Sequence, residues 1–474
     1  MLRSRFVVVG GGITGLAAAW ELTRLLPGAQ ITLLDAADRP GGKLRREPVA
    51  GVPLDVGAES LLARRPEALD LAGELGLADQ VVHPATASAS IWSRSQLHPM
   101  PTGTLMGIPS PPSSALGILT AEEVARASAE EAADRAVGDD VSLGGFVADR
   151  LGEAVVDRLV EPLLGGVYAG RSRSLSLRAC LPQVFEGVRR GVSLTTLARA
   201  SAQASAQSSA AGTPVFAGVD GGVGRLAEVL TERLRAGGVQ IHSRTIAREL
   251  HRTPSGWSVV VGPRPAPEAF AADAVLLAVP AAPAARLLAP HHRGTATALA
   301  EVDYASMAIV TLAVAPEEGL RLPGSGFLVP PVDGRTIKAA TFTSSKWAWA
   351  DRSVDGLAFL RASVGRAGET FNLQRPDEEL VRVAVAEVSE ALGHPLPRLV
   401  DSHVQRWGGA LPQYTVGHVD RVSRIRAGTQ ALPGLELAGA AYEGVGVPAC
   451  IAGGRTAARA LATHLRGRAG EARE

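Results

Sequence analysis

The sequence predicts an α/β protein with a discontinuous Rossmann-like domain, an antiparallel-sheet domain and an inserted helical region. Three observations support this prediction. A strand, a glycine-rich turn, an apolar helix and a second strand follow one another within residues 5–35, as in a parallel sheet. Strand and glycine-turn patterns return in residues 214–290 and again in residues 401–474. Residues 304–364 alternate apolar and polar side chains, which is typical of antiparallel strands.

The domain boundaries follow from this order. We expect the Rossmann-like domain to comprise residues 1–78, 214–290 and 401–474. Residues 79–213 would form the helical insertion on the substrate side, and residues 291–400 the antiparallel-sheet substrate domain. The chain would therefore leave the Rossmann-like domain twice and return to it twice.

Two segments inside these domains have a clear pattern. Residues 199–213 are a low-complexity run of Ala, Ser and Gln that offers no core face, so we expect a mobile surface loop. Residues 378–392 have the apolar spacing of an amphipathic helix.

Composition and charge exclude several classes of protein. The 474 residues suggest roughly two or three domains, and 46% apolar with 20% charged residues is ordinary for a globular chain. The net charge of +1 provides no general attraction for nucleic acid. Cys180 and Cys450 lie far apart, so we expect neither a metal site nor a disulfide framework. The sequence shows no signal peptide and no run of about 20 apolar residues, so we expect a cytoplasmic protein without a transmembrane segment, while peripheral membrane contact stays open.

The first glycine-rich turn has the dinucleotide-binding pattern. Gly10 permits a tight turn, Gly12 lets the backbone approach a pyrophosphate, and Gly15 allows close packing of helix and strand. Asp35 follows the second strand and would accept hydrogen bonds from a ribose. The pattern predicts a bound dinucleotide but does not separate NAD from FAD. The expected contacts of this end of the cofactor are Gly10, Gly11, Gly12, Ile13, Thr14, Gly15, Asp35 and Ala36.

Two further turns favour FAD over NAD. Gly41 and Gly42 follow the second strand between Arg39 and Lys43, whose cations would lie near phosphates. Another tight turn follows at residues 57–60, and this tandem arrangement suits a long, extended cofactor. The expected contacts from these turns are Arg39, Gly41, Gly42, Lys43, Gly57, Ala58, Glu59 and Ser60.

The sequence resembles the FAD-dependent porphyrinogen oxidases of haem biosynthesis, within the amine-oxidase-like flavoproteins. The tandem "GGGITG … DRPGGK" is shared by the whole group. More specific matches span nearly the whole chain: "LHPMPTGTLMGIP" (97–109), "EPLLGGVYAGRSRSLSLRACLPQ" (161–183), "SGFLVP" (325–330), "IKAATFTSSKW" (337–347), "LPQYTVGH" (411–418) and "YEGVGVPACI" (442–451). Two features depart from that family: residues 57–60 read Gly-Ala-Glu-Ser instead of the usual Gly-Pro-Asp-Ser, and Arg171 stands where relatives often carry an acid.

The resemblance implies a six-electron oxidation of coproporphyrinogen III to coproporphyrin III, with oxygen as acceptor and hydrogen peroxide as product. FAD would supply the chemistry, so we nominate no catalytic residue. Transient contacts with neighbouring haem-pathway enzymes would fit that role, whereas nucleic acid is not an expected partner.

The resemblance also gives the last glycine-rich turn a role. Val445, Gly446 and Val447 would place a helix N-terminus against the isoalloxazine ring, where backbone N–H groups stabilise negative charge on the reduced flavin. Two glycine-rich turns would thus hold opposite ends of one cofactor. Ile246 and Trp407 complete the expected cofactor contacts, although a core position for Trp407 is equally compatible with the sequence.

Substrate recognition would need cations beside an apolar slot. Arginine pairs with carboxylates in a bidentate manner, and Arg65 stands where relatives carry a basic residue that would meet a propionate, with Arg64 beside it. A solvated surface role competes at each of these positions. The weaker cationic candidates are Arg171, Arg173 and Lys346. Val167 and Tyr168 would form part of an apolar wall against the macrocycle.

Three alternatives remain open. Protoporphyrinogen IX could be the substrate, since it has two propionates and needs fewer cations. An amine oxidase or a carotenoid desaturase would share the flavin group, but aromatic residues make up only 4% of the chain and nothing indicates a long apolar tunnel. A non-catalytic protein that binds flavin or haem is the third alternative.

Overall fold

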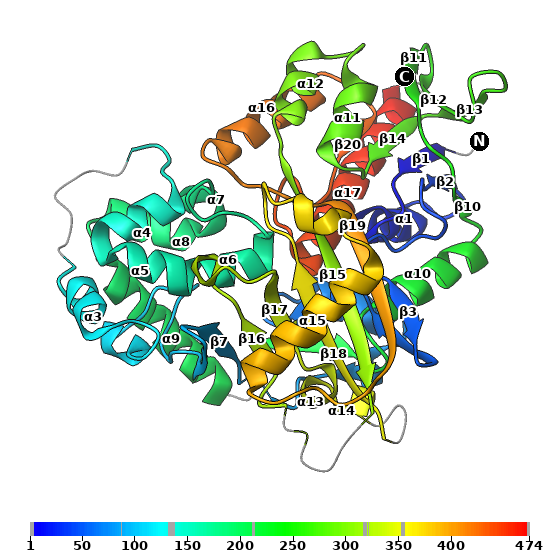
Figure 1. The fold of residues 1–474 in the computed structure, drawn as a ribbon. Coiled ribbons are helices and arrows are strands. Elements are labelled where there is room, and N and C mark those ends of the chain that lie inside the picture. Colours follow the sequence, from blue (N-terminus) through cyan, green and yellow to red (C-terminus); the bar gives the residue numbers. More distant parts are fainter. Residues whose placement is uncertain are drawn as a thin grey trace.

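The computed structural model describes residues 4–86, 88–130, 138–210, 214–315, 320, 322–351 and 356–471. It confirms the predicted α/β fold class. Three parts are visible in Figure 1: a parallel sheet with helices near the chain termini, a long antiparallel sheet, and a helical lobe. No helix among the described residues is long and apolar enough to cross a membrane.

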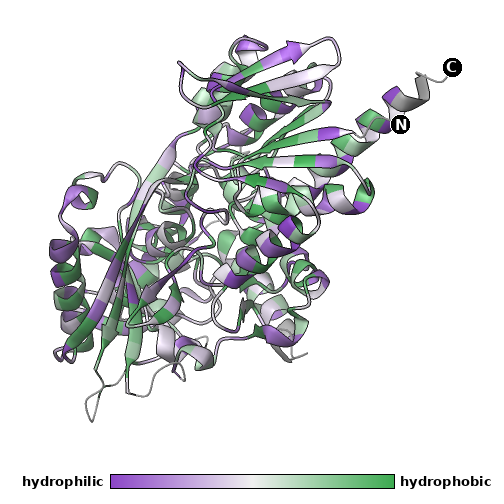
Figure 2. Ribbon diagram, turned by 90° about the vertical axis from the view of Figure 1, so that its right-hand side faces the viewer, coloured by the Kyte–Doolittle hydropathy of each residue, from purple (hydrophilic) through white to green (hydrophobic). Residues whose placement is uncertain are grey.

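A parallel sheet of five strands forms the Rossmann-like part. Its order is β10 (Gln240–His242), β2 (Gln30–Leu34), β1 (Arg5–Val9), β14 (Ala274–Leu277) and β20 (Leu435–Leu437). All four neighbouring pairs are parallel, and the central strands are buried on both faces, as their continuous apolar sequences require. The hydropathy colouring of Figure 2 shows these strands as largely hydrophobic. Segments more than four hundred residues apart therefore meet in one sheet.

Helices cover both faces of this sheet. One face packs against α1 (Ile13–Leu25), α2 (Glu67–Glu74), α10 (Gly224–Ala236) and α17 (Val447–Glu471). The other face packs against α11 (Ala281–Leu288), α12 (Arg293–Ala300), α16 (His418–Gln430) and a small antiparallel sheet of β11 (Glu249–Thr253), β12 (Gly256–Val261) and β13 (Glu268–Ala272). Two glycines set the close contacts, since a Cβ on Gly15 would lie 1.9 Å from the Gly10 carbonyl oxygen, and one on Gly454 of α17 would lie 2.2 Å from the carbonyl oxygen of Thr14.

The second sheet has seven strands and is antiparallel except for the pair β16–β7. Its order is β19 (Leu399–Pro412), β15 (Tyr304–Val314), β18 (Ala358–Val364), β17 (Ile337–Thr341), β16 (Gly326–Leu328), β7 (Ser90–Ser93) and β8 (Gln96–Pro99). The predicted amphipathic helix is confirmed as α15 (Asp377–Leu392), which packs its apolar side on this sheet. Short helices α13 (Thr343–Lys346) and α14 (Ala348–Asp351) follow β17.

Strand pairing changes two of the expected boundaries. The boundary at residue 401 is wrong because it cuts β19, whose backbone pairs with β15 from residue 399 to residue 412. The expected helical insertion of residues 79–213 also gives two strands to the seven-stranded sheet, because β7 pairs with β16. Both errors concern partners that lie far apart in the sequence.

The helical lobe surrounds its own apolar core. It contains α3 (Ala121–Ser128), α4 (Leu143–Leu151), α5 (Glu153–Val155), the π-helical segment η3 (Val156–Val160), α6 (Glu161–Tyr168), α7 (Leu177–Cys180), α8 (Pro182–Arg189) and α9 (Leu194–Ala210). The surface loop expected at residues 199–213 is wrong up to residue 210, and residues 211–213 lie outside the described part of the chain. Leu194 and Ala198 pack into the core, and the Glu130 carboxylate accepts hydrogen bonds from the first N–H groups, so the alanine-rich run continues as a helix.

The remaining elements are short. The strands are β3 (Arg46–Val49) with β4 (Val52–Asp55), and β9 (Phe216–Val219) between β5 (Leu61–Leu62) and β6 (Val81–Val82). The 3₁₀ turns are η1 (Ala78–Gln80), η2 (Pro112–Ala115), η4 (Pro331–Asp333) and η5 (Phe371–Gln374).

Candidate functional site

A cavity of about 420 Å³ lies where the parallel sheet meets the seven-stranded sheet. Three loops that follow parallel strands line it: Gly12 after β1, residues 278–280 after β14, and residues 439–441 after β20. Ligands of open α/β sheets bind at these carboxyl ends of the strands. The opposite wall comes from β15 and β19, through Tyr304, Met307, Ile309, Trp407 and residues 410–412.

The first glycine-rich turn is built as its pattern predicts. Gly10 has a φ of +108°, and a Cβ there would lie 2.3 Å from the Ala278 carbonyl oxygen, so only glycine fits. A Cβ on Gly12 would meet no atom within 4 Å, because Gly12 faces the cavity. Gly12 precedes α1 without a side-chain cap, so the first N–H groups of α1 are available to an anion.

The second turn docks on the first. The Gly41 N–H donates to the Gly11 carbonyl oxygen at 2.8 Å, and a Cβ on Gly42 would lie 3.1 Å from the Cα of Gly12. Gly42, Lys43 and Leu44 then line the cavity. The predicted tandem of turns thus forms one continuous backbone surface.

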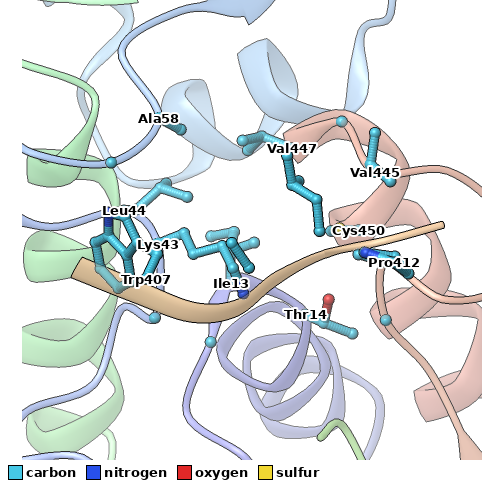
Figure 3. A pocket seen from close by; sticks show the side chains of 18 of the residues that line it. Ile13, Thr14, Lys43, Leu44, Ala58, Trp407, Pro412, Val445, Val447 and Cys450 are labelled. Carbon is cyan, nitrogen blue, oxygen red and sulfur yellow. The ribbon is translucent and has the colours of Figure 1, made fainter. Parts of the chain in front are cut away.

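Lys43 is the cation of this surface (Figure 3). Burial lowers the pKa of its ammonium, while the neighbouring Cys450 opposes that shift. The ammonium makes no hydrogen bond or salt bridge with another residue among those described. A half-buried cation that faces a cavity without a partner among the described residues fits an anionic group of a bound cofactor.

The last glycine-rich turn reaches the same cavity from the other end of the chain. Val445, Gly446 and Val447 line it, and α17 begins at Val447 with Pro448 in its first turn (Figure 3). The Cys450 N–H donates to the Gly446 carbonyl oxygen at 3.0 Å, whereas the N–H groups before it have no partner within the helix. The start of α17 therefore presents donors to the same cavity as the start of α1.

Trp407 and the 57–60 turn form a further part of the wall. The Trp407 indole Nε1–H donates to the Val56 carbonyl oxygen at 2.8 Å, which fixes the ring beside Gly57. A Cβ on Gly57 would lie 2.0 Å from the Lys43 carbonyl oxygen and 3.2 Å from the Trp407 ring. Gly57, Ala58 and Ser60 line the cavity, but Glu59 does not.

Several expected cofactor contacts lie outside the cavity. Asp35 is buried directly after β2, where its carboxylate accepts a hydrogen bond from the Ala37 N–H at 3.0 Å. Burial raises the pKa of this carboxyl, although the hydrogen bond from Ala37 acts to lower it. A Cβ on Gly11 would lie 2.3 Å from the Asp35 carboxylate. The Arg39 guanidinium binds Glu47 at 2.6 Å and does not face the cavity. Ala36 and Ile246 are exposed beside this strand end. Their proposed contacts with a ribose or adenine stay predictions.

Of the expected substrate residues, the structure brings only Val167 of α6 to the cavity. Tyr168 is buried behind that wall, with its ring 5.5 Å from the Tyr414 ring, and burial raises its pKa. Arg65 binds Glu67 at 2.6 Å on an exposed surface. Arg64 lines a separate cavity of about 500 Å³ between α8 and α9.

The other cations are held in salt bridges. Arg171 pairs with Glu369, and Arg173 pairs with Glu153 and Asp157. Lys346 donates to the Ser60 hydroxyl at 3.1 Å and lies 3.6 Å from the Glu59 carboxylate. Their proposed contacts with propionates stay predictions.

The sequence reasoning missed the loops after β14 and β20 and the inner residues of β15. The loops carry a usable signal, because residues 278–280 and 439–441 follow short apolar strands. Met307 and Ile309 carry no such signal in the sequence. Only the pairing of β15 with β19 shows that their side of β15 faces the cavity.

Comparison with known proteins gives consistent relatives. A family model described as flavin containing amine oxidoreductase matches residues 13–462. The coproporphyrinogen III oxidases of Mycobacterium bovis and Bacillus subtilis are 38% and 31% identical, over 94% and 98% of this chain and 94% and 99% of their own lengths. The protoporphyrinogen oxidase of Macaca fascicularis is 30% identical over 95% of this chain and 97% of its own length.

Solved structures agree with these relatives. A crystal structure from Exiguobacterium sp. 255-15, whose protein carries the provisional name protoporphyrinogen oxidase, has a TM-score of 0.84 at 32% identity and covers 98% of this chain and 99% of its own. The cyclohexylamine oxidase of Brevibacterium oxydans IH-35A has a TM-score of 0.67 at 16% identity over 98% of this chain and 100% of its own, a likeness of fold alone.

Proposed function

Because the chain belongs to the flavin-containing amine oxidoreductase family, and to the porphyrinogen oxidases within it, we propose that it uses FAD to oxidise coproporphyrinogen III to coproporphyrin III. One observation supports this most directly. The N-termini of α1 and α17 open onto a single cavity beside an apolar wall and a half-buried lysine without a partner among the described residues. That arrangement suits a long anionic cofactor with a flat substrate next to it.

The residues fit FAD in detail. The open face of Gly12 and the start of α1 would hold the pyrophosphate, and Asp35 would hold the ribose. Lys43 and the start of α17 would lie at the isoalloxazine ring, where donors and positive charge favour the reduced form. When bound, the flavin supplies the electron acceptor for the oxidation.

The protein's own contribution is to orient the substrate and exclude water. The Ile13, Met307 and Ile309 side chains give the cavity apolar surfaces on which a macrocycle can lie flat. The Tyr304 hydroxyl of the wall accepts a hydrogen bond from the Ala281 N–H at 2.9 Å, and burial raises its pKa. A pKa raised in this way keeps the hydroxyl protonated, so no phenolate is available to accept a proton and we assign no general base.

His418 does not fill that role either. Its ring stacks on Tyr414 at 3.9 Å, behind the cavity wall, and burial lowers its pKa to about 4. A neutral imidazole in this position packs as an aromatic ring. We propose that pyrrole protons leave to solvent as successive electron pairs are removed, with oxygen as the final acceptor.

The substrate class rests on the relatives, of which the bacterial ones named above are coproporphyrinogen III oxidases. Protoporphyrinogen IX is the second candidate, because a protoporphyrinogen oxidase is 30% identical over nearly the same length. Transient contact with the enzymes that supply or consume these tetrapyrroles is part of the same proposal.

The test uses the FAD-reconstituted protein without oxygen. Coproporphyrinogen III should bleach the flavin absorbance, air should restore it, and porphyrin fluorescence and hydrogen peroxide should appear together. Protoporphyrinogen IX and a primary amine serve as competing substrates in the same assay. Equal turnover of both porphyrinogens would contradict the proposed preference, and bleaching by the amine alone would contradict the function.

A further inference from the structure

Glu59 belongs to the turn that lines the cavity, yet its carboxylate points away from the cavity. It is nearly fully buried, with 9% of its side chain exposed, and faces the segments that follow β17 and form β18. β18 belongs to the seven-stranded sheet, whereas the turn follows β4, which pairs with β3 in a separate two-stranded sheet. The carboxylate therefore sits at the junction between the turn and the seven-stranded sheet.

Three donors converge on the two oxygens of this carboxylate. The Trp347 indole Nε1–H donates to Oε1 at 2.6 Å, and Arg361 Nη1 donates to Oε2 at 2.9 Å. Lys346 Nζ lies 3.6 Å from Oε1. Arg361 comes from β18 of the seven-stranded sheet, and Lys346 and Trp347 come from the end of α13, which follows β17. Among the described residues, Glu59 is the only acidic residue whose side chain contacts all three of Trp347, Arg361 and Lys346.

The same cations hold the turn on either side of Glu59. The Arg361 Nη2 group donates to the Gly57 carbonyl oxygen at 2.8 Å. Lys346 Nζ donates to the Ser60 hydroxyl at 3.1 Å. Gly57 and Ser60 both line the cavity, so each of these contacts fixes a cavity-lining residue to the sheet.

The cations of this junction favour the ionised form of Glu59. Burial works against ionisation of Glu59, but Lys346, Arg361 and the Trp347 hydrogen bond outweigh it and hold its pKa below the ordinary value. Asp55 is buried nearby and accepts hydrogen bonds from two N–H groups at the start of α10, at 2.7 and 2.8 Å. Burial raises its pKa to about 7, against those hydrogen bonds and the charge of Arg361.

The turn lines the cavity next to residues of the seven-stranded sheet. Gly57 lies beside the Trp407 ring of β19, and Met307 and Ile309 of β15 also line the cavity. Arg361 lies on β18, opposite Thr311 of β15 in the register, so its contacts with the turn link this part of the wall to the sheet that carries Met307 and Ile309.

We propose that Glu59 is a positioning residue for the flavin: its carboxylate ties the 57–60 turn to Trp347, Arg361 and Lys346 and so fixes the place of Gly57 and Ser60 in the cavity wall. This inference rests on the flavin of the proposed function and not on the identity of the substrate. It also reassigns Lys346, whose ammonium is held by the turn instead of facing a propionate.

The main variant is Glu59→Gln. A carboxamide has the same shape but only one acceptor oxygen, so at least one of the three converging donors must face its NH₂ group. The Kd for FAD, measured by flavin fluorescence on the apoprotein, should rise on the order of tenfold. Glu390→Gln is the matched control, because Glu390 also binds an arginine, Arg335, but lies on the exposed side of α15. Its FAD affinity should equal that of the wild type.

Lys346→Met provides a second, milder variant, since Lys346 is partly exposed at the edge of the junction. It should raise the Kd for FAD several-fold and broaden the near-UV circular dichroism of the bound flavin. A raised KM for coproporphyrinogen III with a wild-type FAD Kd would show that Lys346 contacts substrate and would overturn its reassignment.

Two results would overturn the proposal as a whole. Glu59→Gln could lose thermal stability as apoprotein while its FAD Kd stays at the wild-type value, which is the result of a merely structural role. Lys346→Met could also leave FAD affinity and the flavin spectrum unchanged, which decides the question if Glu59→Gln does not fold. If the wild type binds FAD but does not oxidise coproporphyrinogen III, only the proposed substrate fails, and the FAD titrations still test Glu59.

Discussion

Replacing Gly454 by alanine should separate the two helices that bring the first and the last glycine-rich turns together. Gly454 is buried in α17, and a Cβ at this position would lie 2.2 Å from the carbonyl oxygen of Thr14 in α1. Backbone oxygen cannot give way as a flexible side chain can. The two helices must therefore move apart by about 1 Å to restore an ordinary contact.

The magnitude is best measured against a second glycine of the same helix. Gly467 is exposed, and a Cβ there would meet no atom within 4 Å, so Gly467→Ala should gain about 1 kcal/mol from helix propensity alone. Gly454→Ala has the same propensity gain but adds overpacking, which typically costs about 1–3 kcal/mol. We expect the free energy of unfolding of Gly454→Ala to be lower than that of Gly467→Ala by this amount.

The same displacement should weaken cofactor binding. Thr14 of α1 and Cys450 of α17 both line the cavity, so a shift of one helix changes the distance between the two ends that hold the cofactor. A loss of about 1.4 kcal/mol corresponds to a tenfold rise in the Kd for FAD. Denaturant titration of the apoprotein and flavin fluorescence titration measure the two effects. Equal stability and equal FAD affinity in the two alanine variants would refute the reasoning.

Three further predictions concern single groups. Trp407→Phe should raise the Kd for FAD several-fold in a fluorescence titration, because the carbonyl oxygen of buried Val56 loses its donor. Burial, helped by the Arg366 guanidinium, lowers the pKa of Lys338 to about 7. Between about pH 7 and 10 the native state therefore binds fewer protons than the unfolded chain, so the free energy of unfolding rises with pH in that window. Lys338→Met should be more stable than the wild type at pH 7 and should lose that rise in thermal melts across the window. Native protein at pH 8 should show no rapidly reacting thiol until it is denatured, because burial raises the pKa of Cys180 to about 12 and also raises that of Cys450.

Local geometry explains which parts could be predicted from the sequence. The turn at Gly10, Gly12 and Gly15 imposes its shape through contacts within a few residues, so its pattern predicted both the strand–helix unit and the cavity wall. The turn at Val445 and Gly446 was predicted to hold the opposite end of one cofactor from the first turn. The structure brings residues of both turns to one cavity, and their contacts with a cofactor stay predictions. In each case the glycine positions themselves define the backbone path.

Long-range pairing explains the errors. The boundary at residue 401 was wrong because β19 owes its place to β15, about a hundred residues earlier. The alanine-rich run continues α9, whose first N–H groups, those of Leu194 and Thr195, donate to the Glu130 carboxylate from a distant segment. Arg65 forms a salt bridge with Glu67 on the surface, and Lys346 donates to Ser60, which is far away in the sequence. The sequence around each cation does not predict these partners.

The meeting of α1 and α17 has a consequence for how the holoprotein is made. During translation the ribosome releases the first wall of the cavity more than four hundred residues before the second. A nascent chain that lacks residues 439–447 has no donors for the far end of the cofactor. Stable binding of the coenzyme should therefore follow the synthesis of this last turn, and chains that end before it should be colourless.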